Sequence, residues 1–331
     1  MEKNEEITPE PIMNIMWGRW AFSVLYTSVE LEIYTKISQG INTSKQIADK
    51  LNSKEEGVKR LLNACVALKL LIKDKETYAN SPESNQFLVK DRPAYYGDMI
   101  IMNGKRNSLN NLKDAILTGS PTKESLKKRM ENIEQAKIFT RAMHNNAVGP
   151  AIALSKKFDF SKYKKLLDLG GGSGAFSITL TKQYPNLTAI VFDLEKVCEV
   201  AKEYIEKTNS KDKVKTIVGD FFSDKFPKDI DIVLLSQIMH SWSIEENKKL
   251  LKKVYDSLPK EGAVIINEFL LDEDKTGPLY PTLFALNMFV QSAGGNSYTK
   301  SEVKNMLKEV GFHYLETIHL TGPITSIIAK K

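Results

Sequence analysis

The strongest constraint on the fold is a regular alternation of apolar runs and helical segments after about residue 160. Runs that are apolar throughout, rather than at every second residue, are typical of strands that crossover helices cover on both faces. The pattern therefore predicts an α/β domain with a mostly parallel sheet. The expected strands, including two at the C-terminal end, are 165–170, 187–194, 214–221, 231–238, 262–270, 313–320 and 326–331.

The last two strands are joined only by the short segment TGPIT at 321–325. A crossover between parallel strands needs about a dozen residues or more, so this connection allows only a hairpin between antiparallel neighbours. We therefore expect a mixed seven-stranded sheet in which an antiparallel strand lies at the end of the parallel ones.

The N-terminal part of the chain carries a different pattern. Apolar side chains recur at helical spacing over residues 12–38. Two capping boxes, Thr43 with Gln46 and Ser53 with Glu56, predict the starts of two more helices. A short two-stranded pattern follows them. This order of elements is typical of a winged helix.

A winged helix can bind DNA, so a DNA-binding protein that senses a small ligand is one alternative. The expected recognition helix opens with Glu55 and Glu56, and its next face is apolar. Base readout needs basic and amide side chains there. We therefore expect no nucleic-acid partner. The aromatic-rich first helix is larger than a small domain needs to cover itself, which predicts a homodimer through the N-terminal domains.

Composition places the chain among ordinary globular proteins. Its 331 residues suffice for about two domains, and its lysines are scattered among acids, so the net charge of +6 indicates solvated surface. No apolar run approaches the ~18 residues of a membrane helix, and the polar start MEKNEE is unlike a secretory signal. The two cysteines suggest neither a disulfide framework nor a metal site. We expect a cytoplasmic protein with no membrane partner and no metal.

The segment LLDLGGGSG at 166–174 is the most informative for function. A glycine turn between a strand and a helix lets a ligand come close to the backbone. Gly170, Gly172 and Ala175 formally satisfy a dinucleotide fingerprint, so a nicotinamide cofactor is one alternative. However, Asp168 stands directly before the glycines, where a carboxylate suits an ammonium group better than a pyrophosphate.

Acids at the ends of the next two strands point to the same kind of ligand. Asp193 can accept hydrogen bonds from a ribose diol, and Asp220 with Phe221 can hold the amino group and the face of adenine. Ammonium, ribose and adenine along one sheet edge describe S-adenosylmethionine. Its carboxylate can take the helix N-terminus in place of phosphate. We therefore expect S-adenosylmethionine as cofactor, S-adenosylhomocysteine as its product, and no dinucleotide.

The segment DIVLLSQIMHSW carries the fourth strand into His240 and Trp242. Ser243 and Glu246 form a further capping box, so the next helix starts directly afterwards. His240 is thereby placed on a loop at the carboxyl end of a central strand, where such sheets bind their ligands. A neutral imidazole at this place is suited to act as a general base.

The order of these motifs resembles a known family. The winged-helix layout, a helical connector and the motifs LLDLGGGSG, FDL, GDFF and MHSW are similar to the small-molecule O-methyltransferases. That class includes plant caffeic-acid-type and hydroxyindole enzymes and bacterial antibiotic-tailoring relatives. The resemblance covers nearly the whole chain. It implies a dimerisation domain at 1–105, a helical connector at 106–160 that contributes to the substrate pocket, and a Rossmann-like catalytic domain at 161–331.

The resemblance also implies roles for residues at matching positions. His240 is the expected catalytic base, and Glu268 matches an acid that flanks this histidine. The residues expected to bind the methyl donor, from the motifs and the resemblance together, are Asp168, Gly170, Gly172, Gly174, Asp193, Leu194, Asp220, Phe221 and Ser236. The residues expected to line the acceptor pocket are Phe139, Met143, Trp242, Asn287, Met288 and Gly294.

One segment departs from the family pattern. GGNSYT at 294–299 puts Ser297 where a second glutamate stands in plant members, and Tyr298 where arginine is usual. Some relatives use the bound cofactor for decarboxylation, hydroxylation or pericyclic chemistry, so a non-methylating enzyme is the main alternative. The prediction is transfer of a methyl group to a hydroxyl of a small aromatic molecule. The acceptor itself, and whether O, N or S receives the methyl, stay open.

Overall fold

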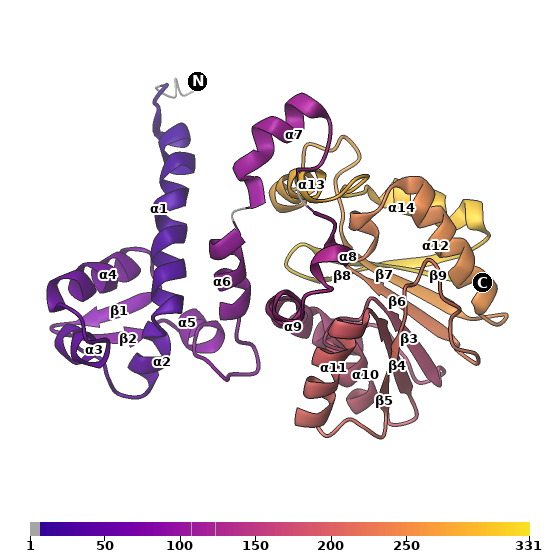
Figure 1. Cartoon of the computed structure of the whole chain (residues 1–331), viewed down its shortest axis with the longest axis horizontal. Coiled ribbons are helices and arrows are strands. Elements are labelled where there is room, and N and C mark those ends of the chain that lie inside the picture. The colour runs from indigo at the N-terminus through magenta and orange to yellow at the C-terminus, as the bar shows by residue number, and fades with distance from the viewer. Residues whose placement is uncertain (1–6, 107, 123) are drawn as a thin grey trace, which may run out of the picture. The chain divides into compact units, whose positions relative to one another are not determined.

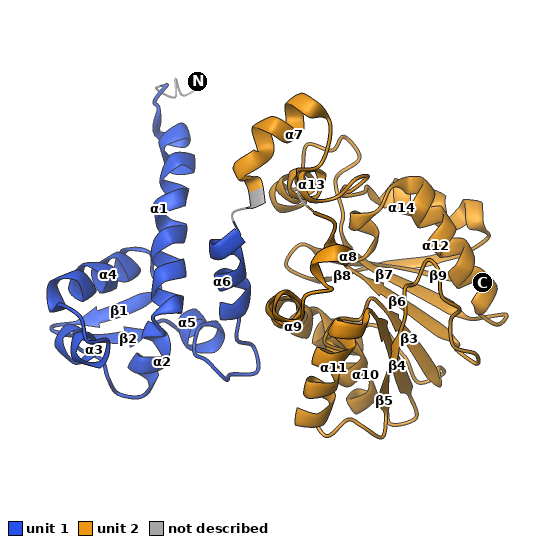
Figure 2. Ribbon diagram, in the orientation of Figure 1, with its two compact units in different colours: residues 1–106 blue, residues 107–331 orange. Residues whose placement is uncertain are grey.

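The structure is a computed structural model that describes residues 7–106, 108–122 and 124–331. The chain divides into two compact units, residues 1–106 and 107–331 (Figure 2). The expected helical connector at 106–160 lies almost wholly in the second unit. Its boundary at 160 stays a prediction. Among the described residues, no helix combines the length and the apolarity that crossing a membrane requires.

The first unit consists of helices around one small antiparallel sheet (Figure 1). Its core contains Ile33, Tyr34, Ile47, Leu62 and Cys65, all fully buried. The elements are α1 (Glu10–Glu30), α2 (Ile33–Ser38), α3 (Ser44–Lys50), α4 (Glu55–Ala67), β1 (Leu71–Asp74), β2 (Thr77–Asn80), α5 (Pro82–Phe87) and α6 (Gly97–Arg106).

Two expectations for the first unit need correction. The helix expected over 12–38 is broken, because Glu32 adopts a left-handed conformation with φ of 53° and separates α1 from α2. The capping box of Thr43 with Gln46 is confirmed. The box expected at Ser53 is wrong: the Ser53 backbone N–H donates to the Ala48 carbonyl at 2.9 Å and closes α3, so α4 begins without a side-chain cap.

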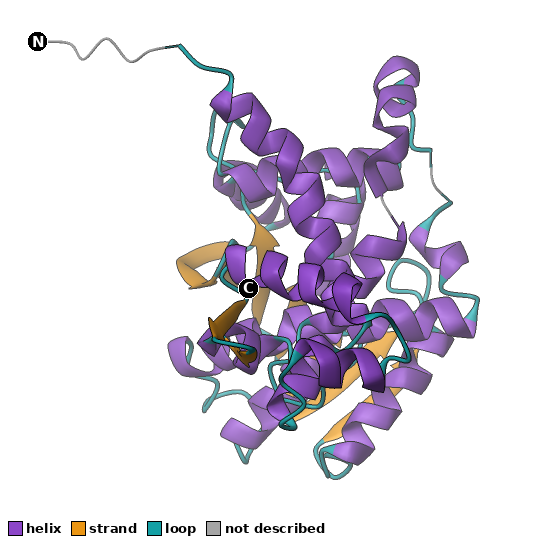
Figure 3. Cartoon of the chain, turned by 90° about the vertical axis from the view of Figure 1, so that its left-hand side faces the viewer, coloured by secondary structure: helices purple, strands orange, loops and turns teal. Residues whose placement is uncertain are grey.

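The second unit alternates strands and helices after a helical segment; Figure 1 labels these elements, and Figure 3 gives helices and strands different colours. The helical segment comprises η1 (Ser108–Asn111), α7 (Leu112–Thr118), α8 (Leu126–Arg129) and α9 (Ile133–Lys157). The elements that follow are β3 (Lys165–Leu169), α10 (Ala175–Gln183), β4 (Thr188–Asp193), α11 (Glu195–Lys207), β5 (Val214–Val218), β6 (Ile232–Ser236), η2 (Met239–Ser241), α12 (Ile244–Ser257), β7 (Ala263–Phe269), α13 (Leu279–Gln291), α14 (Lys300–Val310), β8 (His313–Thr321) and β9 (Ile324–Lys330).

Within the described residues, the strands of this unit form one seven-stranded sheet in the order β5-β4-β3-β6-β7-β9-β8. Strands β3 to β7 are parallel to one another, whereas β9 is antiparallel to both β7 and β8. The mixed sheet and its C-terminal hairpin are therefore confirmed. From β3 the chain first adds β4 and β5 on one side and then β6 and β7 on the other, so the strand order reverses between β3 and β6. Sheets of this kind bind their ligands at that point.

Helices cover both faces of the sheet. One apolar layer joins α9, α10 and α11 to the strands and contains Leu154, Leu180 and Ile205. The other joins α12 and α14 to the opposite face and contains Leu251 and Leu307. Because both faces are covered, strand residues on both sides are buried, which explains why the strands read as continuous apolar runs.

Candidate active site

The glycine turn, residues 170–174, lies between β3 and α10 at the carboxyl end of the sheet. Gly170, Gly172 and Gly174 all have positive φ, of 64°, 57° and 75°, which side chains other than glycine adopt only at a cost. A Cβ on Gly170 would meet Ile238 Cδ1 at 2.3 Å, whereas one on Gly172 would meet nothing within 4 Å. At Gly170 a side chain would therefore have to displace Ile238 and adopt a strained φ, whereas Gly172 has open space beside its backbone.

Two carboxyl groups lie close to this turn, at the carboxyl ends of β3 and β4. Asp168 is 1% exposed and accepts a hydrogen bond from Ser177 Oγ at 2.8 Å. Burial, with a contribution from the charge of Asp193, raises the pKa of Asp168 to about 7. Asp193 accepts from the backbone N–H groups of Gly172 at 2.9 Å and Leu194 at 2.7 Å, and burial raises its pKa to about 6. Among the described residues, the hydrogen-bond donors to both acids are thus neutral groups.

Asp220 and Phe221 lie just beyond the end of β5, in a turn rather than on the strand. The Asp220 carboxylate accepts from the Phe222 backbone N–H at 2.8 Å and from Lys127 Nζ at 2.6 Å. Burial acts to raise the pKa of Asp220, but the bond with Lys127 and the backbone bonds outweigh it, so the pKa is lowered. Lys127, on α8, was not singled out from the sequence.

Trp242 packs edge-on against two aromatic rings that follow Asp220. Its ring lies 6.0 Å from that of Phe221 and 4.7 Å from that of Phe222, between centroids. The sequence assigned Trp242 to the acceptor pocket and Phe221 to the methyl donor. The structure brings the two side chains together in one cluster, so Trp242 contacts a residue of the expected donor site.

Ser236 is the last residue of β6 and accepts a hydrogen bond from Asn267 Nδ2 at 3.3 Å. Asn267 is itself fixed by Ser326 Oγ, which donates to Asn267 Oδ1 at 2.6 Å. After Ser236 the chain turns sharply, since Gln237 has a φ of 60°. This turn leads directly into η2, which carries His240.

His240 and Glu268 form a buried pair. His240 Nδ1 lies 2.8 Å from Glu268 Oε2, and the His240 backbone N–H donates to Glu268 Oε1 at 3.3 Å. The residues are 9% and 3% exposed. Glu268 comes from β7, next to the strand that leads to His240. The capping box of Ser243 with Glu246 is confirmed, so a rigid helix start holds the far side of this loop.

Helix α13 supplies an aromatic contact to this pair. The Phe284 ring lies 4.9 Å from that of His240, edge to face; the sequence gave no signal for this contact. Met288 on the same helix is 8% exposed. Asn287 is fixed by a chain of hydrogen bonds, in which Arg129 donates to Gln291 at 3.3 Å and Gln291 donates to Asn287 at 2.9 Å. Arg129 thereby connects α8 to α13.

The segment after α13 contacts the loop of His240. The Asn296 backbone N–H donates to the His240 carbonyl at 2.9 Å, and the Tyr298 hydroxyl donates to the Trp242 carbonyl. Ser297, which replaces the expected second acid, is 1% exposed, and its hydroxyl has no hydrogen-bond partner among the described residues. Gly294 has a φ of 78°, and a Cβ there would meet the Ser243 backbone nitrogen at 2.9 Å. Gly294 is thus required by packing.

Helix α9 contributes Phe139 and Met143, one turn apart. Phe139 belongs to an apolar cluster with Met130, Leu194 and Val197, so it lies beside a residue of the expected donor site. Met143 is half-buried. The next residue, His144, was not singled out from the sequence, yet its Nδ1 lies 2.7 Å from Ser173 Oγ in the glycine turn.

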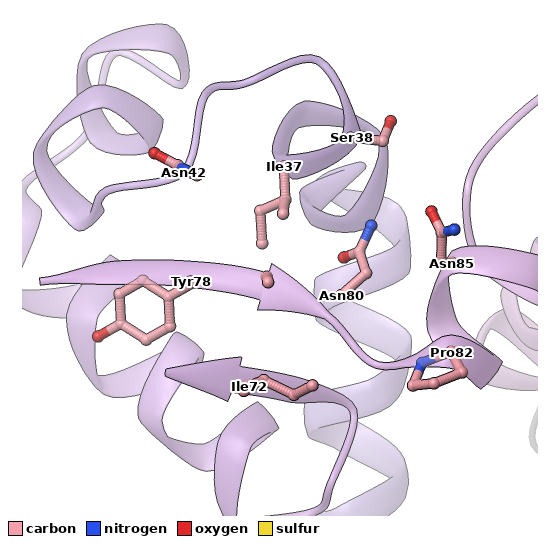
Figure 4. A pocket seen from close by; sticks show the side chains of 9 residues that line it. Ile37, Ser38, Asn42, Ile72, Tyr78, Asn80, Pro82 and Asn85 are labelled. Atoms are coloured by element: carbon pink, nitrogen blue, oxygen red, sulfur yellow. The ribbon is translucent and has the colours of Figure 1, made fainter. Parts of the chain in front are cut away.

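One hollow of about 550 Å³ lies in the first unit, away from all of these residues. Figure 4 shows its lining, which includes Ile37, Tyr78 and Asn80 around the β1–β2 ribbon. No expected site residue belongs to this hollow, and its lining contains no acid or base.

Comparison with protein families decides the class. A model of the O-methyltransferase domain matches residues 113–313, and a model of the O-methyltransferase dimerisation domain matches residues 13–90. The chain belongs to the O-methyltransferase family. The resemblance seen in the motifs is thus confirmed, and this O-methyltransferase combines the family's catalytic and dimerisation domains.

Individual relatives agree with this assignment. This O-methyltransferase is 31% identical to 3-hydroxy-5-methyl-1-naphthoate 3-O-methyltransferase of Streptomyces sahachiroi, over 95% of its own length and 92% of the relative. It is 29% identical to acetylserotonin O-methyltransferase of Bos taurus, over 95% of each chain. The solved structure of human N-acetylserotonin methyltransferase in complex with S-adenosylmethionine superposes with a TM-score of 0.90 at 25% identity, covering 100% of this chain and 99% of the other.

Proposed function

We propose that this O-methyltransferase transfers a methyl group from S-adenosylmethionine to a hydroxyl group of a small aromatic molecule, with His240 as general base. The contact between His240 Nδ1 and Glu268 Oε2, at 2.8 Å, carries the proposal. This contact orients the imidazole of His240 so that it can accept a proton. His240 and the glycine turn both follow the carboxyl ends of strands of the same sheet. Two relatives are named for a hydroxynaphthoate and for acetylserotonin, which favours an aromatic acceptor.

The residues at the glycine turn fit the methyl donor. Gly172 has open space beside its backbone, and loss of hydration raises the pKa of the buried Asp168 and of the half-buried Asp193. A cationic amino acid and a ribose suit this donor set, whereas a diphosphate does not. When bound, S-adenosylmethionine supplies an electrophilic methyl group. The residues that would hold it are Asp168, Gly170, Gly172, Gly174, Asp193, Leu194, Asp220, Phe221 and Ser236.

The proton of the acceptor hydroxyl is removed by Nε2, the imidazole nitrogen of His240 that does not contact Glu268. Because a carboxylate accepts only, Nδ1 of His240 carries the proton in this pair and Nε2 keeps its lone pair. Nε2 can then accept the proton of the acceptor hydroxyl while the oxygen attacks. Glu268 stabilises the imidazolium that forms and holds the ring in orientation. General-base catalysis of this kind contributes about 10²–10⁴-fold.

An apolar surface next to His240 would position the acceptor and exclude water. Phe284 contacts the imidazole directly, and Met288 lies on the same helix. The further residues proposed to line this pocket are Phe139, Met143, Trp242, Asn287, Phe289 and Gly294. In such surroundings the attacking oxygen loses its hydration, and correct placement of the reacting atoms becomes the larger part of the rate enhancement.

The first unit is proposed to join two copies of the chain. Helix α1 exposes large apolar side chains to an extent unusual for a single small domain: Ile12 is 73% exposed, Ile15 82% and Trp20 68%. Contiguous apolar surface of this kind is typical of a protein–protein interface. The match to a dimerisation domain over residues 13–90 supports a homodimer built through this unit.

The test is methyl transfer with isotope-labelled S-adenosylmethionine and a panel of hydroxylated aromatic compounds, with the product identified by mass spectrometry. The proposal predicts a labelled methyl ether with the wild-type chain and a strongly reduced yield with His240→Ala. Binding of the donor without label transfer to any acceptor would instead favour the non-methylating alternative. Equal yields with both chains would remove His240 as the base.

A further inference from the structure

His144 is a half-buried histidine that the reaction itself does not use. It lies on α9, where its ring stacks on Tyr204 of α11 with centroids 3.9 Å apart and planes 23° from parallel. Its Nδ1 lies 2.7 Å from the hydroxyl of Ser173, which is 3% exposed. The stacking fixes the plane of the ring, and the hydrogen bond connects this ring to the glycine turn.

Apart from hydrogen bonds within the turn and to α10, the glycine turn is bonded to strand β4 among the described residues. The Gly170 backbone N–H donates to the Phe192 carbonyl at 2.9 Å, and that of Gly172 donates to Asp193 at 2.9 Å. Ser173 is the first residue of the turn with a side chain able to form a hydrogen bond. Its tie to His144 comes from a helix and not from the sheet. It therefore restrains the part of the turn that the strand contacts do not reach.

We propose that His144 is a positioning residue for the methyl donor, which holds the glycine turn in its binding conformation through Ser173. The proposal rests on the proposed function, namely that this turn binds S-adenosylmethionine. The same helix carries Met143 and Phe139, which are proposed to line the acceptor pocket. His144 therefore connects α9, which carries these proposed acceptor-pocket residues, to the glycine turn of the proposed donor site.

The charge state of the His144 ring supports a hydrogen bond to Ser173 that persists at neutral pH. Burial, together with the charge of Lys207, lowers the pKa of His144 to about 4. The imidazole is therefore neutral around pH 7, with one nitrogen that accepts a hydrogen bond and one that donates. A neutral Nδ1 can accept the proton of the Ser173 hydroxyl, or donate to its oxygen, without placing a charge beside the glycine turn.

The experiment measures binding of S-adenosylhomocysteine to the full-length chain by calorimetry. His144→Ala and Ser173→Ala are each expected to raise Kd about tenfold, the effect of one lost buried hydrogen bond. Because both remove the same contact, the double variant is expected to bind about as weakly as either single variant. His144→Asn, which keeps a polar atom near the place of Nδ1, is expected to restore binding to within about threefold of the wild type. His313→Ala is the matched control, since His313 is exposed on β8.

The outcomes separate this inference from the proposed function. If the wild-type chain fails to bind S-adenosylhomocysteine, the proposed function fails. If the wild type binds and both His144→Ala and Ser173→Ala bind equally well, the inference is overturned while the function stands. Multiplying rather than saturating effects in the double variant, or no rescue by Asn, would also overturn it, because a purely structural role of His144 predicts those results. Ser173→Ala keeps the test decisive if His144→Ala does not fold.

Discussion

The two sides of the site treat their buried acids differently. On the acceptor side, Glu268 has a basic partner in the chain itself, with His240 Nδ1 at 2.8 Å. On the donor side, Asp168 and Asp193 have only a hydroxyl and backbone N–H groups as partners. A buried carboxylate is costly unless a positive charge compensates it. In the part of the chain that the structure describes, Glu268 thus has a basic partner, whereas Asp168 and Asp193 have no positively charged hydrogen-bond partner.

This difference supports the roles proposed for the two sides. Burial raises the pKa of Asp168 to about 7 and that of Asp193 to about 6, because a desolvated carboxyl group is less stable in its charged form. A positively charged ligand would favour the charged form, so the proposed donor and these two acids suit each other. Glu268 and His240 need no ligand to reach their working arrangement, which is expected of a base that must be ready before the acceptor arrives.

Removing the base gives the largest expected effect. We expect His240→Ala to lower kcat by about 10²–10⁴-fold, since no side chain then removes the proton of the acceptor hydroxyl and only water can accept it. Affinity for S-adenosylmethionine should stay close to that of the wild type, because His240 belongs to the acceptor side. Steady-state kinetics at saturating donor, with His319→Ala as an exposed histidine control, measure the first quantity and calorimetry measures the second.

The partner of the base comes next. Glu268→Gln keeps a hydrogen-bond acceptor near Nδ1 but removes the charge that stabilises the imidazolium, so kcat is expected to fall about a hundredfold, the upper range for a hydrogen bond to a charged group. The KM for the donor should change little. A large rise in that KM with unchanged kcat would place Glu268 on the donor side and break the comparison.

A charge removed from the donor side should give the opposite pattern. Asp193→Asn is expected to raise the Kd for S-adenosylmethionine about thirtyfold, because a charged acceptor is lost from the site. At saturating donor, kcat should remain within about threefold of the wild type, since the base and acceptor side are intact. Asp212→Asn provides the matched control, because Asp212 is an exposed acid. Equal Kd values for the two variants would contradict the assignment.

The smallest effect in this series is a pH dependence of donor binding. With a pKa of about 7, Asp168 is mostly protonated below that pH in the free protein, and a bound cation favours its ionised form. Donor affinity should therefore rise with pH, by about tenfold between roughly pH 6 and pH 8, and level off above. Asp193, with a pKa of about 6, adds to the lower part of the slope. Calorimetry across this range should show a flatter profile for Asp168→Asn, and an equally steep one would contradict the role of Asp168.

Much of the fold could be predicted because local signals decide it. The short TGPIT connection fixed the antiparallel hairpin of β8 and β9, and continuous apolar runs indicated a sheet covered on both faces. Local signals failed where two elements compete for one residue. Ser53 follows one helix and precedes another, and it closes α3 instead of capping α4. A capping pattern alone does not show which of the two helices a residue serves.

The site was predictable where its residues end strands, and less so where they come from helices. Asp168 and Asp193 lie where the carboxyl ends of β3 and β4 meet, as strand order requires. The contact of His144 with Ser173 joins residues 29 positions apart and depends on the rotation of α9, which sequence spacing does not determine. The same holds for Lys127, whose Nζ donates to Asp220 at 2.6 Å although the two residues are 93 positions apart. The roles of Asp168, Asp193 and His144 remain proposals that the variants above test.

The most direct test of the account is calorimetric titration of the full-length chain with S-adenosylmethionine and, separately, with NAD. The account predicts saturable binding of S-adenosylmethionine, weakened in Asp193→Asn, and no measurable binding of NAD at the same concentrations. Binding of NAD, or affinity for S-adenosylmethionine that is the same in the wild type and in Asp193→Asn, would contradict the claim that the donor side is built for a positively charged ligand.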